Sequence, residues 1–151
     1  MKIHKLNNMK TIIIMLLLFT AAHAQAQTAA DRVAVLQQLL DHPQLQAHYA
    51  TNPDGSAKQR YILQHPTSFS AEVVAALPAE TAVILDTEEL PAGAANWIRF
   101  RSMGISATVA SGSMNLFVDA GGDGQAAMLM IHFEVQKSGD TWEVTNINIG
   151  G

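Results

Sequence analysis

The feature that most constrains the fold is a stretch of alternating apolar and polar residues near the C-terminus, from Ala126 to Ile149. Every second residue of its first half is strongly apolar: Leu129, Ile131, Phe133 and Val135. The residues of the other set are Met128, Met130, His132, Glu134 and Gln136. A period of two is typical of a strand with one buried face. Because Ser138-Gly139-Asp140 predicts a tight turn and Thr141 to Ile149 a second strand, we expect a β-hairpin whose apolar face packs on the rest of the chain.

The first 26 residues show the three parts of a secretory signal peptide. Three lysines precede the apolar run from Ile12 to Phe19, and small residues follow it as Ala22-His23-Ala24-Gln25-Ala26. The run is shorter than the ~20 residues that span a bilayer, and no second such run follows. We therefore expect residues 1–26 to be a leader removed after Ala24 or Ala26. The mature protein would then be exported, to a bacterial periplasm or outside the cell, with no membrane anchor.

Composition narrows the classes of function. The chain has no cysteine, which excludes a disulfide, a thiolate metal site and the lipid-modified cysteine of a bacterial lipoprotein. Without the three leader lysines, six of the nine basic residues remain against 13 acidic ones, a formal charge of −7. Such an acidic chain without a basic cluster argues against binding to nucleic acid or anionic membranes. Its length suits a single domain, which we assign to residues 27–151.

Apolar spacings and turn residues predict helices in the first half of the mature chain. Apolar residues three and four apart predict a helix over 29–40, which His42-Pro43 would end. Asn52-Pro53-Asp54-Gly55 predicts a turn. We expect short helices over 58–64 and from Ser70, as the capping residue, to Leu77.

The second half predicts strands. Residues 82–85 form a short apolar run, and 87–95 read as a loop. Residues 97–103 alternate, with Ile98 and Phe100 on one face and Trp97, Arg99, Arg101 and Met103 on the other. Residues 105–118 fit one strand bent at Ser111-Gly112 or two short strands. Helices followed by strands indicate an α+β domain, with N-terminal helices on one face of a curved antiparallel sheet of about four to five strands.

This order of elements, closed by the hairpin with Gly139-Asp140-Thr141-Trp142, resembles the nuclear-transport-factor-2-like and cystatin-like architectures. The resemblance covers roughly residues 29–149 and rests on no family motif. It therefore implies a fold and transfers no functional residue.

A glycine-rich segment, Asp119 to Gly124, resembles the start of a calcium-binding loop. The pattern then fails, because its third position is Gly121 and its twelfth is Met130, where such loops place a glutamate. A hairpin connection between two strands explains the same residues. The sequence predicts no metal and no cofactor.

The candidate site is the polar face of the predicted sheet. His132 and Glu134 project from one face, as do Arg99 and Arg101 on another strand, and together they would suit a carboxylate or phosphate. A solvated face with cross-strand ion pairs explains the same residues. Methionines and one tryptophan share this face: Trp97, Met103, Met128 and Met130. That mixture suits a ligand pocket, a dimer interface or a covering helix.

Three hypotheses follow for function. The first is a non-catalytic module that binds a small ligand or a protein partner through this mixed face, using Trp97, Arg99, Arg101, His132 and Glu134. The second is a small enzyme with His132 and Glu134 as an acid–base pair and an arginine as anion anchor. The third is a structural homodimer that buries the face. Neither a zinc-protease His-Glu-x-x-His motif nor a Gly-x-Ser-x-Gly elbow occurs, which favours the non-catalytic hypotheses.

Overall fold

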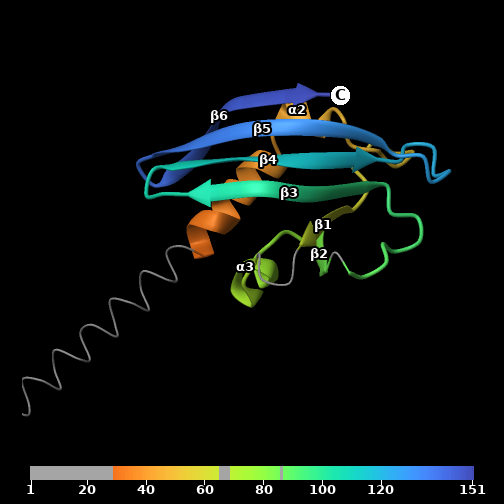
Figure 1. Ribbon diagram of the computed structural model, residues 1–151, viewed down its shortest axis with the longest axis horizontal. Coiled ribbons are helices and arrows are strands. Elements are labelled where there is room, and N and C mark those ends of the chain that lie inside the picture. Colours follow the sequence, from red (N-terminus) through yellow and green to blue (C-terminus); the bar gives the residue numbers. More distant parts are fainter. Residues whose placement is uncertain (1–28, 65–68, 86) are drawn as a thin grey trace, which may run out of the picture.

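A computed structural model describes residues 29–64, 69–85 and 87–151, and shows one sheet with helices on one side of it (Figure 1). The six strands lie in the order β2-β1-β3-β4-β5-β6. Their bounds are β1 Arg60–Gln64, β2 Thr81–Leu85, β3 Asn96–Ile105, β4 Val109–Val118, β5 Ala127–Ser138 and β6 Thr141–Gly150. The first helix covers residues 29–40, α2 Pro43–Gln46 and α3 Ala71–Ala75. The chain is α+β, as predicted, and the predicted leader lies outside the described residues.

The four C-terminal strands form an antiparallel meander. The β5–β6 hairpin turns at Gly139, whose φ of 62° favours glycine, so the predicted hairpin is confirmed. Between β3 and β4 the chain reverses at residues 106–108, where Ser106 Oγ donates to the carbonyl oxygen of Val109 at 2.9 Å. The prediction for residues 105–118 is therefore wrong in detail. Ile105 ends β3, and β4 continues past Gly112 without a break.

The N-terminal half adds two parallel strands that the sequence reading missed. Residues 58–64, predicted as a helix, contain β1, which pairs in parallel with both β2 and β3. The apolar run Tyr61-Ile62-Leu63 is too short for its periodicity to distinguish a helix from a strand. Pairing with β2 and β3 on its two sides makes it a strand. The sheet is thus mixed and six-stranded, rather than antiparallel with four to five strands. The predicted strand at 82–85 is confirmed as β2.

The helices bury one face of this sheet. From the first helix, Val35, Leu39 and Leu40 enter the main core together with inward residues of the strands. Those strand residues include Ile62, Ile98, Met114, Leu116, Ile131, Phe133, Val135 and Trp142. The predicted cap of α3 is confirmed, because Ser70 Oγ accepts from the Val73 amide nitrogen at 3.3 Å. No helix in the described part of the chain is both long and apolar enough to cross a membrane.

One carboxylate joins the two ends of the described chain. Asp31, on the first helix, accepts at Oδ1 from Lys137 Nζ at 2.9 Å and from Trp142 Nε1 at 3.0 Å. These partners lie 106 and 111 residues away along the chain, on β5 and β6. The first helix is therefore held over the C-terminal hairpin by polar contacts as well as by the core.

Candidate functional site

The predicted site residues lie on the face of the sheet opposite the helices, which we call the outer face. On β5 the faces are as predicted: Ile131, Phe133 and Val135 are buried, and His132 is exposed. Met128 and Met130 are 49% and 37% exposed, the only large apolar side chains this open in the described part of the chain. The alternation of apolar and polar residues in β5 therefore predicted its buried and exposed faces correctly.

On β3 a β-bulge changes the faces halfway along the strand. Ile98 pairs with Leu116 on the helix side, which leaves Trp97 and Arg99 on the outer face as predicted. The register then shifts between Phe100 and Ser102, so two residues of β3 oppose one of β4. Met103 therefore packs against the core, and its predicted place on the outer face is wrong. The sequence could not reveal the extra residue, because alternation assumes an unbroken register.

Arg99, His132 and Glu134 share the outer face but not one site, and Arg101 is the extra residue of the bulge. Strand β4 lies between β3 and β5, which separates their backbones by about 10 Å. Arg99 is level with Asn115 and Met130, whereas His132 is level with Ser113, one step further along. The Glu134 carboxylate accepts from Gln136 Nε2 at 2.9 Å and from Thr145 Oγ1 at 3.4 Å. This carboxylate is thus oriented by its neighbours on β5 and β6.

An apolar row crosses the outer face in register, and two of its four residues, Tyr61 and Phe117, were not predicted to lie there. It comprises Tyr61, Trp97, Phe117 and Met128, on β1, β3, β4 and β5, and is called the aromatic row. The rings of Trp97 and Phe117 stack with their centroids 5.6 Å apart and 7° between their planes. Leu63 and Met130 extend the apolar surface in the next row. Tyr61 was not predicted to lie on this face because residues 58–64 were predicted to form a helix.

A buried polar cluster lies on the helix side, where the first helix ends. Arg60 Nη1 donates to the Leu40 carbonyl oxygen at 3.0 Å and to Asp41 Oδ1 at 2.8 Å. The Tyr49 hydroxyl also donates to the Leu40 oxygen, at 3.0 Å, and its ring centre lies 5.6 Å from the Arg60 guanidinium carbon. Burial raises the pKa of Tyr49 to about 12, against the opposing effect of Arg60. The cluster satisfies a carbonyl at the helix end and is structural.

The glycine-rich segment after β4 is a hairpin connection. Asp119 is buried, and its two carboxylate oxygens accept from the amide nitrogens of Gly122 and Gly124 at 2.7 and 2.9 Å. Its oxygens therefore stabilise the loop itself. Among residues 29–64, 69–85 and 87–151, no three His, Asp or Glu side chains gather in a way that could hold a metal ion.

Comparisons with known proteins do not assign a function, so the assignment depends on the geometry of the outer face. The chain matches no protein-family model, no curated protein and no solved structure. The outer face, with its aromatic row and polar end, is therefore the candidate site on the strength of its own residues.

Proposed function

We propose that the protein is a non-catalytic interaction module that pairs with a second copy of itself through the outer face. The aromatic row is the observation that carries this proposal. Side chains of this size normally lie under another layer, and here they lie on the sheet face that the helices leave open (Figure 1). Aromatic residues and methionine are also the residue types enriched at the centres of protein interfaces.

The size of the outer face suits a dimer. Four strands of 10 to 12 residues and two of five make up the sheet. At ~4.8 Å between strands and ~3.3 Å per residue, the face measures on the order of 800 Å². A standard interface buries about 800 Å² on each partner. A second copy would cover the face completely.

The side chains of the outer face are also complementary to those of the same face on a second copy. A two-fold axis that runs along the strands between β3 and β4 would place Trp97 opposite Phe117 of the second copy, and Tyr61 opposite Met128. Arg99 would then face an uncharged Asn115, so no like charges meet at the centre. His132 and Glu134 fall toward the polar rim. Such an isologous contact closes with two subunits.

The open position of His132 and Glu134 supports a non-catalytic role. The described residues form cavities of about 310, 330 and 470 Å³, and neither residue lines any of them. His132 is exposed to water, whereas acid–base catalysis uses groups positioned around a bound substrate. The resemblance of the element order to nuclear-transport-factor-2-like and cystatin-like architectures does not choose among functions, because one fold serves many.

The test is the mass of the mature chain in solution, measured by sedimentation equilibrium from about 1 to 100 µM, a range that brackets ordinary dimer affinities. We expect a dimer that Phe117→Asp converts to a monomer, since a carboxylate would be buried at the centre of the interface. Gln38→Asp is the matched control, because Gln38 is exposed on the first helix, away from the outer face. A wild-type chain that stays monomeric throughout, or a Phe117→Asp variant that still dimerises, would contradict the proposal.

We also propose that the dimer forms after export. The order of basic, apolar and small residues in the first 26 positions supports a leader that is cleaved. Expressed with its leader in a bacterium, the chain should appear in the exported fraction with Gln25 or Gln27 as its first residue. Intact-mass measurement of that fraction gives the answer directly, and retention of Met1 would exclude this route.

A further inference from the structure

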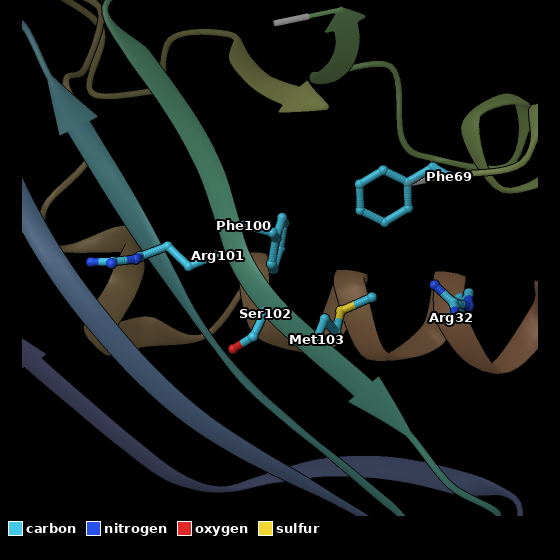
Figure 2. Close-up of a pocket in the computed structure, with 6 residues that line it drawn as sticks. All are labelled: Arg32, Phe69, Phe100, Arg101, Ser102 and Met103. Carbon is cyan, nitrogen blue, oxygen red and sulfur yellow. The ribbon is translucent and has the colours of Figure 1, made fainter. Parts of the chain in front are cut away.

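A cavity of about 310 Å³ opens beside the bulge of β3, between that strand, the first helix and the start of α3 (Figure 2). Its lining residues are Arg32, Phe69, Phe100, Arg101, Ser102 and Met103. The cavity lies on the helix side of the sheet, away from the aromatic row. It is therefore separate from the surface proposed for dimer formation.

The bulge creates this cavity. In a regular strand Phe100 and Met103 would point to opposite faces, but the extra residue lets both point toward the first helix. Gly112 makes the bulge sterically feasible, since a Cβ atom there would collide with the carbonyl oxygen of Ser102. Strand β1 pairs with β3 only as far as Arg99, so in the described part of the chain no strand covers this edge of β3 beyond the bulge.

Three apolar side chains, Phe69, Phe100 and Met103, line the cavity beside polar atoms of Arg32, Arg101 and Ser102. The rings of Phe69 and Phe100 meet edge to face, with centroids 6.0 Å apart and 76° between their planes. Figure 2 shows Met103 beside Phe100, with Phe69 and Arg32 on the same side of β3. The Arg101 side chain points away from this group. Apolar side chains beside a few placed polar groups are typical of small-molecule sites.

Arg32 gives the cavity its charge. Two basic side chains of the described chain have ion pairs, Arg60 with Asp41 and Lys137 with Asp31. Arg32 has no hydrogen bond or ion pair with any described residue, and none of the described residues that line the cavity carries a carboxylate. A guanidinium without a partner among the described residues, lining a cavity with three apolar side chains in an otherwise acidic chain, is suited to an anion.

We propose that this cavity binds a small amphipathic carboxylate, with the apolar part against Phe69, Phe100 and Met103 and the carboxylate on the Arg32 guanidinium. The planar guanidinium can donate two parallel hydrogen bonds to the two carboxylate oxygens. The volume lies at the lower end of the roughly 300–1,000 Å³ found for ligand pockets, which favours a short apolar chain or a single ring. The site is independent of the proposed dimer.

Octanoate is the probe. Octanol, which keeps the apolar chain without the carboxylate, and acetate, which keeps the carboxylate without the chain, are the comparison compounds. Methyl NMR of the mature chain reports on location, because Met103 lines the cavity whereas Met128 and Met130 lie on the outer face. We expect octanoate to shift the Met103 methyl signal in a saturable way and to leave those of Met128 and Met130 in place. Octanol should bind about tenfold more weakly, and acetate more weakly still, since each lacks one half of the recognition.

Arg32→Gln is the decisive variant, and Lys58→Gln is its control. Both remove one positive charge that has no ion pair among the described residues, and Lys58 lies outside the cavity. We expect Arg32→Gln to weaken octanoate about tenfold by calorimetry while octanol is unchanged, and Lys58→Gln to alter neither. Thermal melts would verify that both variants remain folded.

Three results would overturn the proposal. The first is no shift of the Met103 methyl at about 10 mM octanoate, a concentration that would detect even a millimolar affinity. The second is equal affinity of the Arg32→Gln and Lys58→Gln variants for octanoate. The third is a shift confined to Met128 and Met130, which would place the apolar probe on the outer face instead.

Discussion

The two faces of the sheet use the same alternating strands and have opposite surroundings. On the covered face of β5, Ile131 and Val135 are completely buried beneath the helices. On the outer face of the same strand, Met128 and Met130 are 49% and 37% exposed although they are also large and apolar. The difference teaches that apolar character alone does not make a core residue. A second layer is also needed, and the outer face has apolar residues suited to one although no layer covers them in the described part of the chain.

The largest effect that separates the faces should come from Phe133→Ala compared with Met130→Ala. Phe133 is buried, and its ring meets that of Phe100 edge to face at 6.3 Å. Its loss should reduce the free energy of unfolding by about 3–5 kcal/mol, whereas Met130→Ala should cost less than about 1 kcal/mol in the monomer. Urea unfolding at low protein concentration measures both. Equal costs would mean that the two faces are not energetically distinct.

Alkaline pH tests the covered side through Tyr49. The folded pKa of about 12 lies above the ordinary value of 10.0, so the folded protein retains a proton that the unfolded chain loses. Stability from this group is therefore complete below pH 10 and falls as the pH rises toward about 12, by about 2–3 kcal/mol. Urea unfolding at about pH 9 and 11.5 should show the loss in wild type. A Tyr49→Phe variant should lose much less over the same interval, and an equal loss would assign the effect to other groups.

Replacing the glycine at the bulge should have an effect of intermediate size, because a backbone shift there moves side chains on both faces of the sheet. Gly112→Ala brings a methyl group against the Ser102 carbonyl oxygen, so the backbone of β3 or β4 must shift. We expect a loss of about 1–3 kcal/mol, the usual cost of overpacking. The neighbouring change Ser113→Ala, at a partly exposed position on the same strand, is the control. Similar melting temperatures for the two variants would show that the bulge tolerates a side chain.

The smallest effect should come from His132→Ala on the outer face. His132 is exposed and has no hydrogen bond with a described residue, so the free energy of unfolding should change by less than about 0.5 kcal/mol. Thermal denaturation detects a change of that size as a shift of a few degrees. A larger loss would indicate that the polar end of the outer face contributes to the fold, which would weaken the contrast between the faces.

Local patterns predicted the parts of the fold that depend on local order. The hairpin of β5 and β6, the first helix and the Ser70 cap all follow from residue spacing within a few turns or one strand pair. Strand β1 could not be recognised, because its five residues become a strand through parallel partners that begin 21 and 36 residues away, at Thr81 and Asn96. Parallel pairing across such distances leaves little signal in the sequence.

The candidate site was predicted only in part for the same reason. Trp97, Arg99, His132 and Glu134 do share the outer face, since each strand's alternation sets its own faces. The prediction that they form one site required β3 and β5 to be neighbours, and β4 lies between these two strands. The bulge moved Met103 to the covered face and produced the cavity, and no residue type in β3 marks it. Topology and register, rather than composition, account for these errors.

The bond between Asp31 and the C-terminal hairpin has a consequence for the time course of folding. Its partners, Lys137 and Trp142, leave the ribosome more than a hundred residues after Asp31 does. The meander from β3 to β6 can assemble from successive short hairpins, which close quickly because their loops are short. We therefore expect the first described helix to dock after the meander, because the contacts of Asp31 need both β5 and β6.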